Sequence, residues 1–460
     1  PNRLVWANWE KMNGEQANPG DSTSYICPVT TSPANGYAVN SLCDYFGLPT
    51  VGQVTAAATV THNSLPLRAY NLIWNEWFRD ENLVNSVAVP TGDGPDANTL
   101  FALKRRGKRH DYFTSCLPWP QKGAAVSLPL GISAPIKTSV GVQTSGNAPG
   151  MIMYNANTGV GAGATQNIGT TGTGRMGYYN ATPAGTYVAE LYPANLYADL
   201  SQATAATINS LRQAFQIQKL LERDARGGTR YTEVLRAHFG VNSPDARLQR
   251  PEYLGGGSTP VVINPISQTS GSTVTGSTTP LGTLAAMGTA VGHNHGFRQV
   301  FTEHGFIIGL VNVRADLTYQ QGMRRMWSRS TRYDFYWPAF AMLGEQAVLN
   351  KEIYCTGGVN DDLVFGYQER WAEYRYLPSL ITGRFRSTAA QTLDPWHLAQ
   401  KFTALPTLNT TFIEDTPPLQ RILAVGAAAA GSEFYLDCFF DIGTVRPMPM
   451  YSVPGLIDHF

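Results

Sequence analysis

Charged residues are scarce in this chain, and their scarcity excludes several classes of protein. Only 15% of the 460 residues are charged, and 34 basic residues nearly balance 33 acidic ones, so the formal net charge is +1. Dedicated nucleic-acid-binding proteins are usually far more basic, because neutralising phosphate drives their affinity. If the chain encloses a genome, another component must supply most of the counter-charge. A chain that exposes little charge has either a large core or a surface covered by partners.

Cysteines and long apolar runs are also lacking. The cysteines are odd in number, scattered, and form no CxxC pair: Cys27, Cys43, Cys116, Cys355 and Cys438. This pattern argues against a disulfide framework and a zinc site, and it is typical of folding in a reducing cytoplasm. No apolar run approaches the roughly 18 residues that span a bilayer. No secretion signal is evident. We therefore expect no insertion in a membrane.

Motifs that carry catalysis are missing. There is no GxSxG elbow, no HExxH and no P-loop. The GxGxxG match at residues 172–177 lies in Gly/Thr-rich sequence, without the strand and helix that would present phosphate to a helix N-terminus. Glu369 and Glu373 flank Arg370, where an ion pair is expected rather than a glycosidase pair facing across a sugar. We predict no catalytic residue and no cofactor.

A metal site is weakly indicated at best. His293 and His304 lie close in sequence, but Glu303 is the one acid nearby. Metal sites need further ligands and supporting carboxylates. We predict no metal.

Glycine, proline and aromatic residues, by contrast, are plentiful. The chain has 45 Gly, 29 Pro, 22 Tyr and 9 Trp, a composition typical of many strands joined by turns, with much aromatic area to bury. Residues 306–313 form a short apolar run, and residues 433–440 alternate between two faces, so both are predicted strands. Strands this far apart in sequence, with large insertions between them, indicate a mainly β sandwich whose loops gather at its ends.

A few helices and two unusual loops interrupt the strands. Helical spacing is found in residues 65–83 and again in residues 199–240, where Gly227 and Gly228 stop one helix and a shorter one follows near residues 231–239. Residues 131–193 hold 12 Gly and three charged residues, and residues 255–292 hold no charged residue. Loops this long are functional, disordered or elaborated excursions. We predict that residues 131–193 are an excursion that packs against copies of itself.

Two basic stretches are candidates for binding nucleic acid. The first has five basic residues in six positions: Lys104, Arg105, Arg106, Lys108 and Arg109. A solvated loop explains it equally well. The second interleaves arginine with aromatic residues: Arg324, Arg325, Arg329 and Arg332. Such interleaving suits stacked single-strand bases, but it suits subunit interfaces better.

Tryptophan marks the expected subunit contacts, because Trp, Tyr and Arg are enriched at interfaces. The candidates are Trp6, Trp9, Trp327, Trp337 and Trp371.

Several long blocks together resemble one family. They include LPLRAYNLIWNEWFRDENL (65–83), FALKRRGKRHDYFTSCLPWPQKG (101–123), VFTEHGFIIGLVNVRADLTYQQG (300–322) and VFGYQERWAEYRYLPSLITGRFR (364–386). These blocks are similar to major capsid proteins of the Microviridae, small single-stranded-DNA bacteriophages, and most of all to the gokushovirus-like branch. The resemblance covers nearly the whole chain apart from the two excursions.

The resemblance implies a single domain over residues 1–460, an eight-stranded antiparallel jelly-roll sandwich with long inserted loops and a few short helices. It implies that 60 copies close a T=1 icosahedral shell around a circular single-stranded DNA genome. Residues 131–193 best fit the branch's inserted loop, which forms threefold protrusions and contacts a bacterial host receptor. Residues 255–292 are a second Gly/Ser/Thr-rich loop.

The resemblance also implies partners and a location. The expected partners are an internal scaffolding protein, a DNA pilot protein and a small basic DNA-binding protein, and the near-neutral charge agrees with a need for the last. The location is the virion capsid, assembled in the host cytoplasm. A β-sandwich carbohydrate-active enzyme and a lectin-like binding module are rival interpretations, and neither explains the long matching blocks.

Overall fold

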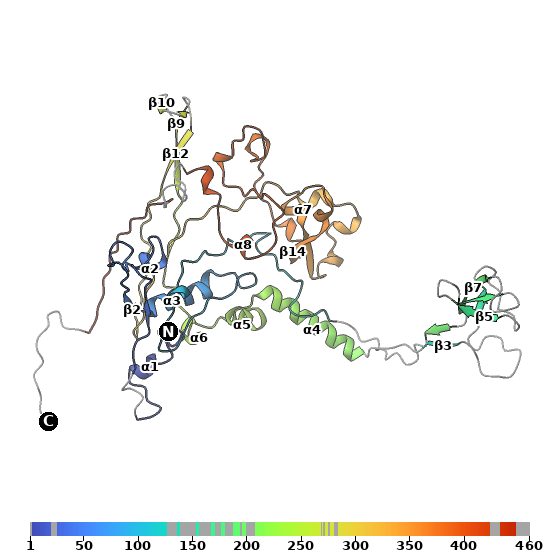
Figure 1. Ribbon diagram of the computed structural model, residues 1–460, viewed down its shortest axis with the longest axis horizontal. Helices are drawn as coiled ribbons and strands as arrows, with labels where there is room; N and C mark the ends of the chain where they lie inside the picture. Colours follow the sequence, from blue (N-terminus) through green and yellow to red (C-terminus); the bar gives the residue numbers. More distant parts are fainter. Residues whose placement is uncertain are drawn as a thin grey trace, which may run out of the picture. The chain divides into compact units, whose positions relative to one another are not determined.

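The chain divides into two compact units (Figure 1). The computed structural model describes residues 2–19, 25–126, 136–138, 153–155, 167–170, 176–179, 187–193, 196–198, 208–267, 269, 272–274, 277–279, 284–423 and 433–447. Unit 1 comprises Pro1–Pro118 and Val241–Phe460, and unit 2 comprises Trp119–Gly240. The predicted excursion at residues 131–193 falls within unit 2. The prediction of a single capsid domain is not tested by this division and stays a prediction.

The strands are short and pair mainly in twos. They are β1 (Val29–Thr31), β2 (Thr61–Asn63), β3 (Ile136–Thr138), β4 (Met153–Asn155), β5 (Asn167–Thr170), β6 (Met176–Tyr179), β7 (Tyr187–Pro193), β8 (Leu196–Ala198), β9 (Val262–Ser267), β10 (Ser272–Val274), β11 (Ser277–Thr279), β12 (Leu284–Thr289), β13 (Glu345–Leu349) and β14 (Val364–Glu369).

Most helices are a single turn or two. The α-helices are α1 (Trp9–Met12), α2 (Leu42–Tyr45), α3 (Leu65–Ile73), α4 (Ile208–Gly227), α5 (Tyr231–Phe239), α6 (Asp245–Leu248), α7 (Asn350–Ile353) and α8 (Thr410–Ile413). A π-helix, η2 (Trp74–Phe78), continues α3. The 3-10 turns are η1 (Asn2–Leu4), η3 (Asn98–Leu100), η5 (Arg325–Ser328), η6 (Arg332–Asp334), η7 (Pro338–Phe340), η8 (Val359–Asp362), η9 (Ala372–Tyr374), η10 (Gly383–Phe385), η11 (Asp394–Trp396) and η12 (Leu419–Arg421).

The largest core of unit 1 lies around the antiparallel pair β13–β14. Glu345 faces Glu369 at one end of this ladder, and a bulge follows Val348. Residues of β13 alternate between buried and half-buried, as expected for a strand with one face on a core. The members of this core come from segments far apart in the sequence: Tyr112, Phe113, Cys116, Val348, Ile353, Phe365, Ala372 and Phe412.

Helix α3 is the central element of the N-terminal part of unit 1. It begins after Ser64 with a proline in its first turn, a position where the missing amide proton costs nothing. Its buried face contains Leu65 and Leu67, which belong to two separate small cores. The helix predicted over residues 65–83 is confirmed as far as Phe78, where η2 ends and Arg79 becomes extended.

Unit 2 combines small sheets with two helices. Strands β4, β7, β6 and β5 form a four-stranded sheet in that order, and β3 pairs with β8. Helix α5 ends at Gly240, whose φ of +69° is left-handed, and Gly228 beyond α4 has a φ of +96°. Glycine adopts such angles without a steric penalty, so it terminates helices efficiently. The two helices predicted between residues 199 and 240 are therefore confirmed within the described residues.

The two strands predicted at residues 306–313 and 433–440 are wrong for the isolated chain, because neither segment joins a ladder in the structure. Their apolar side chains are largely exposed, and Tyr435 and Phe439 are 100% and 94% exposed. A strand requires a neighbour that pairs with its amide and carbonyl groups, and these segments have none among the described residues of this chain. The expectation of sheets with few helices holds, and the eight-stranded sandwich stays a prediction.

Candidate nucleic-acid and subunit interfaces

The first basic stretch is a loop held by backbone hydrogen bonds on both sides. The amide of Gly107 donates to the carbonyl of Phe78 at 2.8 Å, and the amide of Lys108 donates to the carbonyl of Ile413 at 2.8 Å. The indole of Trp74 donates to the carbonyl of Arg105 at 2.8 Å. The backbone of the loop is therefore held between η2 and α8.

Two of its basic side chains point into unit 1. Lys108 is 5% exposed, and its Nζ lies 3.2 Å from Oε1 of Gln400 and 4.5 Å from the centre of the Phe412 ring. Burial lowers the pKa of Lys108 to about 8, although nearby acidic groups partly oppose the shift. The guanidinium of Arg106 stacks 5.0 Å from the Phe78 ring centre and donates to Oδ1 of Asn312 at 3.2 Å. Lys108 is thus a core cation without access to DNA.

The other members of this loop remain accessible. Arg105 is exposed, and Lys104 is half-buried with its amide donating to the Tyr70 hydroxyl at 2.9 Å. Arg109 Nη1 lies 3.6 Å from Oδ1 of Asp316, and both side chains are more than half exposed. Exposed ion pairs of this kind contribute little and separate readily. Arg105 and Arg109 are the side chains of this loop best placed to meet a phosphate.

The second basic stretch, which we call the arginine–aromatic segment (residues 324–337), is anchored by three of its arginines. Arg324 donates to the carbonyl of Pro378 at 2.8 Å. Arg325 donates to the carbonyl of Ala347 at 2.8 Å and to Oε1 of Glu352 at 3.1 Å. Arg329 Nη2 lies 3.6 Å from Oε1 of Glu373. These arginines hold the segment against β13 and α7 and have little freedom to bind a ligand.

Glu352 is the buried counterpart of Arg325. Burial raises the pKa of Glu352, while Arg325 and hydrogen bonds from the Leu349 amide and the Tyr112 hydroxyl oppose the shift. The Tyr112 hydroxyl donates to Oε2 of Glu352 at 2.9 Å. Because a buried carboxylate without a cation beside it is very costly, the first role of Arg325 is to stabilise the fold around Glu352.

The outer side of the arginine–aromatic segment is different. Arg332 lies 5.2 Å from the centre of the Trp337 ring. Trp327 and Trp337 are 72% and 45% exposed, and Tyr333 and Phe335 are also exposed. Arginine and several aromatic rings together on one exposed segment can stack on bases or on another protein.

The five tryptophans predicted for subunit contacts fall into two groups. Trp6 is wholly buried, and Trp371 is 9% exposed, with its indole donating to the carbonyl of Phe340 at 3.2 Å. Such side chains offer a neighbouring subunit no surface, so both are core residues of this chain. Trp9 is half-buried against Trp6, with ring centres 6.1 Å apart. Trp327 and Trp337 are the exposed candidates that remain.

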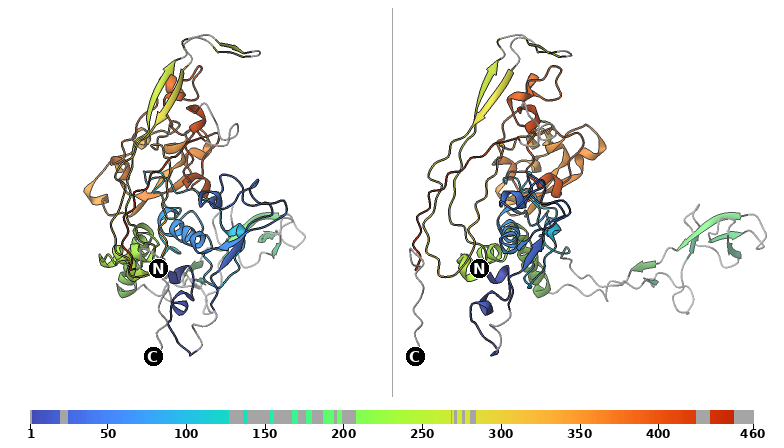
Figure 2. Two further views of the ribbon diagram at one scale, coloured as in Figure 1. Left: turned by 90° about the vertical axis from the view of Figure 1, so that its left-hand side faces the viewer. Right: turned by 60° about the vertical axis from the view of Figure 1, so that its left-hand side comes forward.

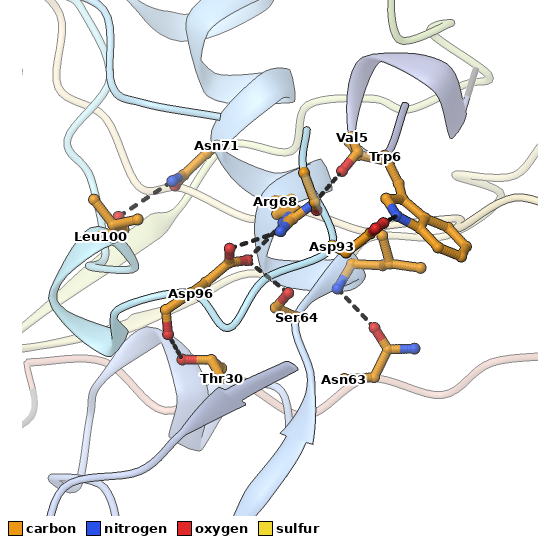
Figure 3. A network of polar contacts seen from close by, with 12 residues as sticks. Val5, Trp6, Thr30, Asn63, Ser64, Arg68, Asn71, Asp93, Asp96 and Leu100 are labelled. Carbon is orange, nitrogen blue, oxygen red and sulfur yellow. Dashed lines mark hydrogen bonds and ion pairs between the residues drawn. The ribbon is translucent and has the colours of Figure 1, made fainter. Parts of the chain in front are cut away.

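A buried ion pair, absent from the sequence-based predictions, joins three segments of unit 1 (Figure 3). Arg68 is fully buried and donates from Nε and Nη2 to the two carboxylate oxygens of Asp96, both at 2.6 Å. Its Nη1 donates to the carbonyls of Val5 at 2.7 Å and Gly92 at 2.9 Å. The Ser64 hydroxyl donates to the same carboxylate at 2.7 Å. The sequence does indicate that Arg68 is buried, because it lies three residues after Leu65 on the apolar face of a predicted helix.

Comparisons with known proteins agree with the predicted family. The model of the capsid protein (F protein) family matches residues 1–456. The chain belongs to this family. It is 50% identical over 473 aligned residues to the capsid protein VP1 of Bdellovibrio phage phiMH2K, covering 100% of this chain and 84% of that protein. It is 44% identical over 520 residues to VP1 of Chlamydia phage 1 (99% and 85% covered) and 38% identical over 473 residues to VP1 of Spiroplasma virus 4 (99% and 84% covered).

The resemblance to major capsid proteins of the Microviridae, gokushovirus-like branch, is thereby confirmed. The chain is a structural protein of the phage virion, a class whose members assemble into multimeric capsids. In the part of this capsid subunit that the structure describes, no helix is long and apolar enough to cross a membrane. Among the same residues, no group of three or more His, Cys, Asp or Glu could hold a metal ion.

Proposed function

We propose that 60 copies of this chain close a T=1 icosahedral shell around a circular single-stranded DNA genome. The observation that carries the proposal is the segment at residues 433–447, which joins no strand among the described residues and in which the apolar side chains of Tyr435, Phe439 and Val445 are almost fully exposed. Burying one such side chain contributes about 1.5–3 kcal/mol, and closed symmetry repeats every contact. The strand period of residues 433–440 then has a purpose: these residues complete a sheet when subunits come together.

The same reasoning supports an eight-stranded antiparallel jelly roll as the fold of the assembled subunit. Residues 306–313 and 433–440 have the composition of strands and pair with no strand in the part of the chain that the structure describes. In the proposal these segments gain their ladder partners on assembly. Residues 131–193, inserted in unit 2, form the protrusions at the threefold axes and contact the bacterial host.

We propose that DNA meets the inner face of the shell through Arg105, Arg109 and Arg332, with Trp327 and Trp337 stacking on bases. The buried Lys108 and the anchored Arg325 are left out, because their partners lie within the chain. A net charge of +1 per subunit neutralises little of a genome, so a small basic DNA-binding protein supplies the rest. An internal scaffolding protein and a DNA pilot protein complete the assembly, which takes place in the host cytoplasm.

The test is expression of the chain with its scaffolding protein, followed by electron microscopy of the product. We expect uniform icosahedral particles of 60 subunits with knobs on the threefold axes. Replacing residues 131–193 by a short Gly/Ser linker should remove the knobs and leave the particles intact. Smooth wild-type particles would support the proposed shell and refute the assignment of residues 131–193 to a protrusion. Soluble monomers under every condition would refute the shell and favour a binding module.

A further inference from the structure

The ribbon formed by β9 and β12 joins no other strand among the residues that the structure describes. The two strands pair through six residue pairs, from Val262 opposite Thr289 to Ser267 opposite Leu284. Figure 2 shows them as a long hairpin. Between residues 255 and 300 every residue whose burial is described is exposed, except Ala286, which is half-buried. A two-stranded ribbon on its own is marginally stable in water, so a partner is needed.

Both faces of this ribbon carry exposed apolar side chains, beside the polar Asn264 on one face and Ser267 on the other. Residues opposite each other in an antiparallel pair lie on the same face, and successive residues alternate. One face therefore has Val262, Ile266 and Met287, each at least half exposed, and the other has Ile263, which is 47% exposed, and Pro265. A ribbon lying on its own subunit would bury one face and present a polar face to water. Apolar residues on both faces indicate a cover on both.

The ribbon also lacks the charges that protect exposed strands. Natural edge strands are guarded by lysine and other charged residues, which prevent pairing with other chains. Residues 255–292 contain no Asp, Glu, Lys or Arg in a chain that is 15% charged overall. Nucleic acid is a poor occupant for such a surface, because no cation is present to meet phosphate. An uncharged apolar ribbon is complementary to another copy of itself.

The two legs of the ribbon come together beside Gly292. A Cβ on Gly292 would lie 2.9 Å from Nε2 of His295 and 3.0 Å from Oγ1 of Thr259, so these two side chains would have to shift to admit it. Thr259 and His295 are themselves in hydrogen-bond contact at 3.2 Å. A preformed element loses less conformational entropy on binding than a flexible one. The contact between the legs therefore favours the paired conformation of the ribbon and lowers the entropy cost of association.

Symmetry then selects the arrangement. A twofold contact would join the same face of two ribbons and leave the other face of each in water. A closed ring about a higher axis joins one face of each ribbon to the opposite face of the next, so both are covered. We infer that the β9–β12 ribbons of three or five copies associate face to face in a ring about a symmetry axis of the particle. This inference rests on the proposed shell.

The test places one cysteine on each face of the ribbon. In a background of Cys355→Ser and Cys438→Ser, which removes the two exposed cysteines, Val262→Cys and Ile263→Cys are combined. A short bismaleimide is added to purified particles, and the products are separated by size under denaturing conditions. A ladder that ends at trimer or pentamer is expected from the double variant, with far less product from either single variant. Unassembled subunits of the same variant are the control, and they give monomer.

A second pair of variants keeps the shell and the ring distinguishable. Ile263→Lys places an unpaired charge against the apolar face of the next ribbon and should lower the yield of ring product on the order of tenfold or more. Ile263→Val retains the apolar face and should assemble as the wild type does. Cross-linked products no larger than a dimer would refute the ring, and so would Ile263→Lys particles with unchanged yield and melting temperature. Neither result would contradict the proposed shell. If the wild-type chain forms neither particles nor a ladder, both proposals fail.

Discussion

Removing the guanidinium of Arg68 should be among the most damaging single substitutions in unit 1. Arg68→Met keeps most of the side-chain volume and removes the charge. It leaves the Asp96 carboxylate, whose side chain is 4% exposed, without its cation, and the carbonyls of Val5 and Gly92 without their donor. The N-terminal segment, α3 and the loop at residues 92–96 then lose their common anchor.

The magnitude follows from the four hydrogen bonds and their burial. Hydrogen bonds to charged groups contribute roughly 1.5–3 kcal/mol each, so four would sum to far more than single substitutions cost. Breaking a buried pair by removing one partner costs about 3–5 kcal/mol, because the desolvation of the guanidinium is recovered when it is removed. We take the second figure. The double variant Arg68→Met/Asp96→Leu leaves no unpaired charge and should cost less than Arg68→Met. Its remaining cost is roughly 1–3 kcal/mol for each of the Val5 carbonyl, the Gly92 carbonyl and the Ser64 hydroxyl that finds no other partner.

Urea unfolding of the unassembled chain, followed by tryptophan fluorescence, measures these free energies. Trp6 is a suitable reporter, because it is wholly buried and its indole donates to Oδ1 of Asp93 at 2.6 Å beside the pair. Arg375→Met, at an exposed arginine whose side chain is 64% accessible, is the matched control and should change stability by less than about 1 kcal/mol. A cost below about 1 kcal/mol for Arg68→Met, or equal costs for the single and double variants, would refute the reasoning.

Three further predictions concern other parts of the chain. The pKa of Lys108 is lowered from its ordinary value of 10.5 to about 8, so the buried ammonium destabilises the fold fully below pH 8 and less and less as the pH rises toward 10.5. Lys108→Met should therefore raise the free energy of unfolding by about 1–2 kcal/mol at pH 7 and by less at pH 9.5, as measured by thermal unfolding. Gly366→Ala would place a Cβ 2.8 Å from Cβ of Cys116 and should cost about 1–3 kcal/mol by overpacking in urea unfolding, and no loss would contradict the core described above. In binding of oligo-dT measured by anisotropy, Trp327→Ala should cost about 1–3 kcal/mol for the base it stacks on, and Arg332→Ala should reduce the salt slope by about 0.7; if neither changes, the segment is a subunit contact.

The parts of the fold that were predictable are those fixed by local signals. Helices α4 and α5 follow from periodic apolar residues and from glycines that adopt left-handed angles at Gly228 and Gly240. Helix α3 was predicted for the same reason, but its early end was not. These features depend on residues within a few positions of each other, so a single sequence is sufficient for them.

The direction of a side chain was not predictable where distant segments decide it. Lys108 and Arg109 are neighbours in one basic run, yet Lys108 lies under the ring of Phe412 and Arg109 is exposed. Trp6 and Trp327 were equally good interface candidates by residue type, and the first proved to be fully buried. Charge and aromatic character are visible in the sequence, whereas burial is set by contacts between residues hundreds of positions apart.

Different residues of this chain contribute to the free energy of folding and to the free energy of subunit association. Subunit stability resides in small cores and in buried pairs such as Arg68 with Asp96, whereas the apolar residues of the β9–β12 ribbon and of residues 433–447 are exposed and contribute little to it. Substitutions in the two sets should therefore be nearly additive, because distant sites without shared partners couple weakly. Arg68→Met should lower the urea midpoint and leave the particle geometry of the surviving subunits unchanged. Ile263→Lys should leave the urea midpoint unchanged and prevent closure of the ring. A subunit that keeps these energies separate can fold in isolation and associate only when enough neighbours are present to cover both faces of the ribbon.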